Sequence, residues 1–264
     1  MPYFILYLFF LLQSLLLLTA ARQTELIDAL NIQTREMTTK QLATAIDSVY
    51  VESGYYPTSF AALAALPGYE YLKNTSRPFQ SMAVATNILD PDFKFSRVAV
   101  FSQDPYDYPL PDAIYLAATN NACGAGDFAT STTWCGSQRS NWWKHETREI
   151  ISANIARERN RQRRLLDKFT SWYSTSTGNN IYPDPGAAAA ALSALVAGFA
   201  QTATTCTGIY TWQGIPIDCT DLYSIWGTPT VYNYLSRTHV ALLTKTPYIK
   251  ADGTPLYIST EISL

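Results

Sequence analysis

The sequence predicts an α+β fold in which a long N-terminal hydrophobic helix packs on a small antiparallel sheet, followed by a second, similar helix-plus-sheet module. Three observations predict this fold class. An apolar run at residues 4–18 continues into an amphipathic segment without Gly or Pro. A second segment free of Gly and Pro covers residues 140–173, and strand-like segments separated by turns follow both. We therefore expect an apolar transmembrane or signal-anchor segment at 1–21, a first module at 22–139 and a second at 140–264.

The apolar run carries no charged residue, and with its flanks it reaches the roughly 18 residues that a helix needs to cross a bilayer core of about 30 Å. Two interpretations stay open. The run is either a retained membrane-anchoring helix or a signal peptide that is cleaved after the small residues at 19–21, although no basic residue precedes it. In the first case, the following side chains would face lipid or neighbouring helices: Phe4, Leu8, Leu11, Leu12, Leu15 and Leu18.

The amphipathic segment that follows predicts that the helix continues through residues 22–52, where apolar side chains recur at three-, four- or seven-residue intervals, and stops at Gly54. The joined helix would reach about 70 Å at 1.5 Å per residue. A short helix capped by Thr58 or Ser59 should come next. Two strands at 81–90 and 94–103 then flank an Asp-Pro-Asp turn.

The second half repeats this order. A long helix at 140–173 carries apolar residues at both ends and basic residues in its middle, so we expect its centre to be solvated. An alanine-rich run at 187–195 predicts a short helix, and 247–258 predicts a hairpin around an Asp-Gly turn. Because the Tyr-Pro dipeptides at 56–57 and 182–183 are offset by 126 residues, the order suggests a divergent duplication.

The cysteines fall into two local pairs, Cys123 with Cys135 and Cys206 with Cys219, and each pair would close a short loop. Local disulfides of this kind are typical of an oxidising compartment. The alternative is four buried thiols. We expect an exported protein whose soluble part is periplasmic or extracellular and anchored at the membrane.

Catalytic signatures are missing from the sequence, which contains no Gly-x-Ser-x-Gly, His-Glu-x-x-His, phosphate-binding or dinucleotide-binding motif. His145 or His239 could pair with a cysteine as base and nucleophile, but cysteines in disulfides cannot act as thiolates. The sequence therefore favours a protein that is not an enzyme and that holds no cofactor or metal.

Charged segments have simple structural explanations. The net charge of −2 gives no electrostatic footprint for nucleic acid. The basic segment 157–168 could bind nucleic acid or anionic lipid, but it is more simply a solvated helix face. The acidic residues at 90–92 and 104–107 could hold calcium, yet Asp-Pro turns explain them as well.

Several aromatic residues surround the first cysteine loop and could stack on a sugar ring or on a partner protein. Core packing is the commoner use of such side chains. The candidates for partner or glycan binding are Tyr106, Tyr108, Trp134, Trp142 and Trp143.

The apolar helix that runs into an amphipathic helix and then into residues 54–63 (Gly-Tyr-Tyr-Pro-Thr-Ser-Phe-Ala-Ala-Leu) resembles the type IV pilin and type II secretion pseudopilin families. Residues 221–232, with their Trp-Gly-Thr-Pro core, look like a segment common in pseudopilins. The sequence departs from those families because no acidic residue lies within the apolar run and because the soluble part is doubled.

This resemblance implies a subunit of a pilus-like or secretion assembly, whose apolar helix stays in the membrane until it packs against other pilin-like subunits. Adhesion to a surface or glycan ligand would fit such a subunit. The alternative is a secreted or periplasmic enzyme, or a carbohydrate-binding protein, from which residues 1–21 are removed as a signal peptide.

Overall fold

The computed structural model describes residues 2–74, 80–102, 111–136, 141–175, 179–199, 206 and 208–264. The chain divides into two compact units, which we call the first unit (Met1–Thr86 with Arg97–His145) and the second unit (Asn87–Ser96 with Glu146–Leu264). Each is described by itself.

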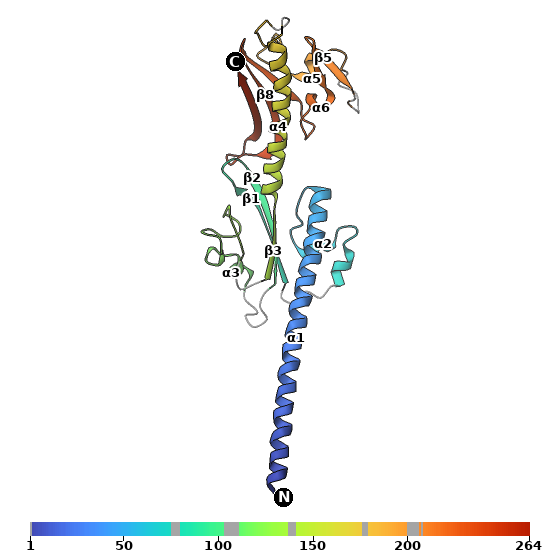
Figure 1. The fold of residues 1–264 in the computed structure, drawn as a ribbon, viewed down its shortest axis with the longest axis vertical. Helices are drawn as coiled ribbons and strands as arrows, with labels where there is room; N and C mark the ends of the chain where they lie inside the picture. The colour runs from blue at the N-terminus through green and yellow to red at the C-terminus, as the bar shows by residue number, and fades with distance from the viewer. Residues whose placement is uncertain are drawn as a thin grey trace. The chain divides into compact units, whose positions relative to one another are not determined.

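The first unit begins with α1, a single helix that runs from Pro2 to Ser53. It ends at Gly54, whose φ of +76° is open to glycine and strained for other residues, and whose N–H donates to the carbonyl of Tyr50 at 2.8 Å. Figure 1 shows α1 as one continuous rod, and no other drawn element of the first unit lies beside its N-terminal half. The predicted helix end is therefore confirmed.

The C-terminal half of α1 supplies one side of the core of the first unit. Leu42, Ile46 and Val49 recur at three- and four-residue spacing and are at most 3% exposed. They pack against Leu63 of the short helix α2 (Phe60–Ala64) and against Val98 of the sheet. Ser59 caps α2, since its side chain accepts a hydrogen bond from the N–H of Ala62.

The sheet of the first unit has three strands in the order β1-β2-β3, and both strands predicted for residues 81–103 are confirmed. Short helical turns connect α2 to the sheet and β2 to the first disulfide loop. The elements are η1 (Glu70–Asn74), β1 (Gln80–Leu89), β2 (Lys94–Ser102), α3 (Asp112–Leu116), η2 (Ala118–Asn120) and β3 (Asn141–Glu146).

The prediction of a membrane-anchoring N-terminal helix is contradicted. In the part of the chain that the structure describes, no helix is long and apolar enough to cross a membrane. The apolar stretch of α1 whose side chains are described covers residues 12–20, and charge follows at Arg22.

The second unit packs one long helix, α4, on a four-stranded antiparallel sheet of order β4-β7-β8-β9, with a β5-β6 hairpin beside it. The core joins apolar residues of α4, such as Leu165 and Phe169, to Tyr232 and Leu242 of the sheet. Its elements are α4 (Thr147–Tyr173), β4 (Ala189–Ala191), α5 (Leu192–Leu195), β5 (Ile209–Trp212), β6 (Ile215–Asp218), α6 (Cys219–Leu222), β7 (Thr230–Ser236), β8 (His239–Ile249) and β9 (Pro255–Ser263).

Two helices predicted in this half are partly strands. Residues 141–146 form β3 of the first unit rather than the start of α4, and Ala189–Ala191 form β4, which pairs with β7. Backbone pairing with a distant strand overrides local helix propensity in both places. The hairpin predicted at 247–258 is confirmed as the end of β8, a turn and the start of β9.

A tyrosine of each Tyr-Pro dipeptide folds back onto the helix before it. The ring of Tyr56 stacks on Tyr50 of α1 at 4.7 Å between centroids, and Tyr182 contacts Tyr173 of α4 at 4.8 Å. The disulfides differ in position, because the first lies between β2 and β3 and the second precedes β7. The two units thus share the start of a module but not the rest of its order.

Candidate functional site

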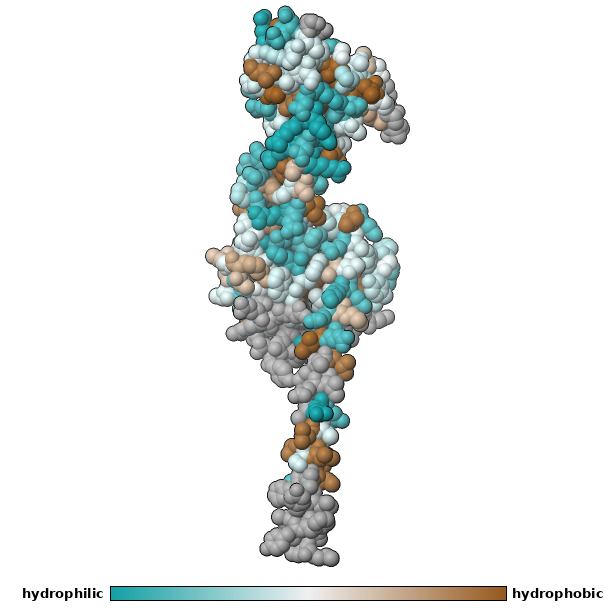
Figure 2. All heavy atoms as spheres, viewed as in Figure 1, coloured by the Kyte–Doolittle hydropathy of each residue, from teal (hydrophilic) through white to brown (hydrophobic). Residues whose placement is uncertain are grey.

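The most unusual surface of the first unit is the leucine segment, which we define as residues 12–20 of α1. Every side chain in it is exposed. The exposed fractions of its leucines are Leu12 58%, Leu15 62%, Leu16 61%, Leu17 72% and Leu18 60%. Figure 2 shows hydrophobic side chains along this part of the molecule. Contiguous exposed apolar surface of this kind marks an interaction site.

The leucines surround the helix and do not form a stripe. Successive residues of a helix are about 100° apart, so the run from Leu15 to Leu18 covers most of its circumference. A helix that is apolar all round is ordinarily buried on all sides. The hydroxyl of Thr19 donates to the carbonyls of Leu15 and Leu16, each at 2.9 Å. Burial of the segment would therefore leave this hydroxyl hydrogen-bonded.

The residues predicted for this helix divide into two sets. Leu12, Leu15 and Leu18 lie in the leucine segment and are exposed. The side chains of Phe4, Leu8 and Leu11 are not among those that the structure describes.

Of the five aromatic residues proposed for partner binding, Trp134 belongs to the buried core. Trp134 is only 1% exposed and packs edge to face against Phe128 at 5.0 Å and Trp142 at 5.5 Å. Trp142 and Trp143 are partly exposed. Tyr106 and Tyr108 lie outside the described residues. Core packing therefore explains Trp134, and among the described candidates Trp134 and Trp142 are in ring contact.

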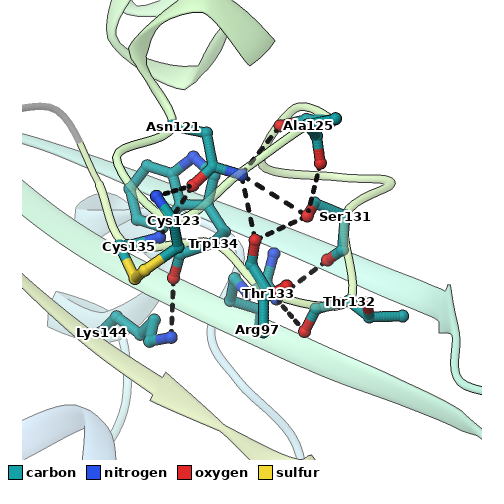
Figure 3. The surroundings of a disulfide bond; sticks show 11 residues. Arg97, Asn121, Cys123, Ala125, Ser131, Thr132, Thr133, Trp134, Cys135 and Lys144 are labelled. Atoms are coloured by element: carbon teal, nitrogen blue, oxygen red, sulfur yellow. Dashed lines mark hydrogen bonds between the residues drawn. A yellow bond between two sulfur atoms is a disulfide. The ribbon is translucent and has the colours of Figure 1, made fainter.

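The first disulfide loop is organised around a fully buried arginine, Arg97 of β2 (Figure 3). Its guanidinium donates to the carbonyl oxygens of Phe128 at 2.8 Å, Ser131 at 3.0 Å and Thr132 at 3.3 Å. Residues 97–102 of β2 are all buried, so both faces of the strand are covered at this point. The loop is thus held as part of the core.

Asn121 joins the two ends of this loop. Its Oδ1 accepts hydrogen bonds from the N–H groups of Cys123 at 3.1 Å and Cys135 at 3.2 Å, and these two cysteines form the predicted disulfide. Cys206 and Cys219 form the second, as the sequence predicts. With both pairs bonded, no cysteine has a free thiol that either histidine could activate as a nucleophile.

His145 contacts α1 instead. Its Nδ1 lies 2.9 Å from a carboxylate oxygen of Asp47 and 3.1 Å from the hydroxyl of Tyr56. His239 lies 3.3 Å from a carboxylate oxygen of Glu261. Among the described residues, no group of three or more His, Cys, Asp or Glu side chains is placed to hold a metal ion. Asp90, considered above for calcium, pairs with an arginine of α4 at 2.6 Å.

A buried polar network crosses the second unit, where the sequence predicts a solvated helix centre. Glu158 and Gln162 are 0% exposed and Arg161 is 7% exposed. Arg161 Nε donates to both carboxylate oxygens of Glu158, at 3.1 and 3.0 Å, and its Nη2 donates to Thr230 at 2.8 Å. Thr244 donates to Glu158 at 3.1 Å. The expectation was wrong for these three residues, which a spacing of three or four turns toward the sheet. It holds for the exposed basic residues of the same stretch, Arg157, Arg159, Arg163 and Arg164.

The same network holds the segment that resembles pseudopilins. Glu158 accepts a hydrogen bond from the N–H of Ile225 at 3.2 Å, and Arg161 Nη1 donates to the carbonyl of Asp221 at 3.0 Å. Ser224 and Thr228 close the turn with a hydroxyl contact of 2.7 Å. Buried, hydrogen-bonded charges thus hold this segment against α4. We call residues 218–225, which include its first part, the wall.

A basic cleft lies between this wall and α4. It has a volume of about 630 Å³ and is lined by Arg157, Arg161, Arg164, Lys168, Cys206, Asp218, Cys219, Thr220, Asp221, Tyr223, Ser224 and Ile225. Lys168 contacts Asp218 at 2.6 Å and Asp221 at 2.7 Å. Burial lowers the pKa of the Lys168 ammonium, but the hydrogen bonds and charges of the two aspartates outweigh burial and raise the pKa above its usual value.

Comparison with known proteins found no matching family model, no matching curated protein and no matching solved structure. The resemblance to pilins and pseudopilins stays an expectation from the sequence. Function is therefore inferred from the described residues and their contacts.

Proposed function

We propose that the protein is an exported structural subunit of a pilin-like assembly, in which the leucine segment of α1 packs against the same segment of neighbouring copies. One observation carries this proposal. Five leucines distributed around a helix are each more than half exposed, and none of the drawn elements of the first unit lies beside them (Figure 1). A surface of this kind is stable in water only when other molecules cover it.

The size of the apolar surface indicates how many neighbours are needed. Full burial of a leucine contributes roughly 1.5–3 kcal/mol, so five leucines that are about 60% exposed would contribute about 5–9 kcal/mol. Association costs about 4–15 kcal/mol in lost freedom of motion. A single neighbour, which covers only one side of the helix, would recover about half of the gain. We therefore expect a bundle of several helices and not a dimer.

The two disulfides support the exported part of the proposal. Each closes a short local loop, at sequence separations of 12 and 13 residues, and disulfides persist in oxidising compartments. The periplasm and the cell exterior, where such a filament would lie, are oxidising compartments of this kind. Assembly through the leucine segment requires only helix packing, so the proposal does not depend on a membrane-crossing anchor.

The test compares two charge substitutions on the same helix. Leu15→Asp places a carboxylate in the leucine segment, whereas Val51→Asp places one at an 83% exposed position near the other end of α1. The full chain is purified in non-ionic detergent, and its assembly after detergent removal is followed by sedimentation velocity and negative-stain electron microscopy. We expect ordered oligomers for wild type and Val51→Asp and a shift to monomer for Leu15→Asp.

Two results would count against the proposal. One is a wild-type chain that stays monomeric after detergent removal, as a secreted enzyme or carbohydrate-binding protein would. The other is ordered assembly of Leu15→Asp at the wild-type level, since a carboxylate cannot be buried unpaired in a helix bundle at small cost.

A further inference from the structure

The basic cleft of the second unit is lined by one stripe of α4. Arg157, Arg161, Arg164 and Lys168 follow one another at intervals of four, three and four residues, which places all of them on the same face of the helix. The stripe runs along about 16 Å of helix at 1.5 Å per residue. The remaining wall comes mostly from Asp218–Ile225.

Two of the four cations are already paired within the protein. Arg161 is paired with the buried Glu158, and Lys168 bridges Asp218 and Asp221. The outer two, Arg157 and Arg164, are exposed. Within the described ranges, no carboxylate lies at salt-bridge distance from either one. The cleft therefore carries two arginines with no carboxylate partner among the described residues, seven residues apart on the helix, while Lys168 shares its one charge between two aspartates.

The opposite wall is largely satisfied by internal hydrogen bonds. The carbonyls of Thr220 and Asp221 accept from Arg161, the N–H of Ile225 donates to Glu158, and the Ser224 hydroxyl pairs with Thr228. A ligand would therefore gain most of its polar contacts from Arg157 and Arg164. Their α-carbons are about 10 Å apart along the helix axis. A cleft of about 630 Å³ is far larger than a single small anion.

We propose that the basic cleft binds an acidic peptide segment of a partner protein, with one carboxylate on Arg157 and another on Arg164. Arginine suits this task because its guanidinium pairs with a carboxylate through two parallel hydrogen bonds. An extended peptide rises 3.2–3.4 Å per residue, so carboxylates three residues apart match the spacing of the arginines.

The pattern of charges in the cleft selects against a continuous polyanion. Asp218, whose side chain is 46% exposed, lines the cleft beside Lys168 and would repel phosphates at every step of a nucleic acid. Two separate carboxylates on a neutral backbone avoid this repulsion. The inference concerns the second unit alone and does not depend on assembly through the leucine segment.

The test uses the full chain in non-ionic detergent and two fluorescein-labelled peptides, read by fluorescence anisotropy. One peptide carries two glutamates three residues apart in a Gly/Ser background, and the other carries glutamines in their place. The variant Arg157→Gln/Arg164→Gln removes the two arginine charges that have no carboxylate partner among the described residues. The control Arg159→Gln/Arg163→Gln removes two exposed charges of the same helix that do not line the cleft.

We expect the acidic peptide to bind wild type, to bind Arg157→Gln/Arg164→Gln at least tenfold more weakly, and to bind the control within about twofold of wild type. The glutamine peptide should not bind. Thermal unfolding of each variant checks that it is folded. Three results would overturn the proposal: no binding of the acidic peptide, equal weakening by the two double variants, or displacement of the peptide by an equal concentration of inorganic phosphate.

Discussion

Replacing Glu158 by methionine tests the buried network of the second unit. The substitution keeps the length of the side chain and removes its charge. Glu158 is 0% exposed and accepts hydrogen bonds from Arg161, Ile225 and Thr244. Its loss leaves the Arg161 guanidinium, which is 7% exposed, without a counter-charge. Removing one partner of a buried ion pair costs about 3–5 kcal/mol, and we expect Glu158→Met to lower the free energy of unfolding by this amount.

The double variant Glu158→Met/Arg161→Met should be less destabilised than Glu158→Met alone. Both charges are then absent, so no buried guanidinium remains unpaired. The N–H of Ile225 still loses its acceptor, which costs about 1–3 kcal/mol. Restoration of stability by the second substitution would show that the cost of the first lies mainly in the unpaired charge.

Unfolding has to be followed in the second unit by itself, because the two units need not unfold together. Hydrogen exchange measured by mass spectrometry on peptides from β8, as a function of urea concentration, reports this unit. Arg163→Met is the matched control, since residue 163 is exposed on the same helix and should change stability by at most about 0.5 kcal/mol. A loss below about 1 kcal/mol for Glu158→Met, or a double variant less stable than the single one, would refute the reasoning.

Three further predictions concern other parts of the fold. Gly136→Ala should destabilise the first unit by about 2–4 kcal/mol in thermal unfolding, because φ is +76° and a Cβ would lie 2.5 Å from the ring of Trp142. Ser59→Ala should cost about 1 kcal/mol, measured by urea unfolding, because α2 loses its cap. Burial raises the pKa of Tyr232, so its contribution to stability should be complete below pH of about 10 and decline above it, as the unfolded tyrosine ionises. Tyr232→Phe should flatten this alkaline decline in urea titrations, at the cost of the hydrogen bond to Pro183.

Local signals in the sequence were sufficient for elements whose ends are set by nearby residues. Gly54 ends α1, Ser59 begins α2, and the hairpin between β8 and β9 turns where Asp252 and the following glycine predict it. The disulfides were predictable for the same reason, because both partners lie within one short loop. In each case the deciding interaction spans only a few residues.

Non-local contacts explain the errors. Residues 141–146 are strand because they pair with β2, and Ala189–Ala191 are strand because they pair with β7, which begins about 40 residues later. The burial of Trp134 depends on Phe128 and Trp142 of other segments. Composition identifies a tryptophan near a loop but does not show which neighbours cover it.

The candidate surfaces were predictable to different degrees. The leucine segment is visible in the sequence as an uncharged run, although its membrane-crossing role was not supported. The basic cleft was hidden, because Arg157, Arg161, Arg164 and Lys168 look alike in sequence. The structure shows that Arg161 pairs with Glu158 and that Lys168 pairs with Asp218 and Asp221, which lie about 50 residues away in the sequence. These contacts identify Arg157 and Arg164 as the two arginines without a carboxylate partner among the described residues.

The two long helices explain how one chain could carry two different surfaces. Both α1 and α4 pack on a sheet and end before a Tyr-Pro dipeptide whose tyrosine folds back on the helix. They differ at the start, because α1 begins with an apolar segment that extends beyond its sheet, whereas α4 begins at Thr147, directly after β3. Only α1 therefore offers apolar surface on all sides for a bundle of helices. The exposed face of α4 is free to carry charge, and a basic stripe there would have been incompatible with burial among identical helices. The leucine segment and the basic cleft lie on different helices, so we expect a substitution in one surface to leave the function proposed for the other unchanged.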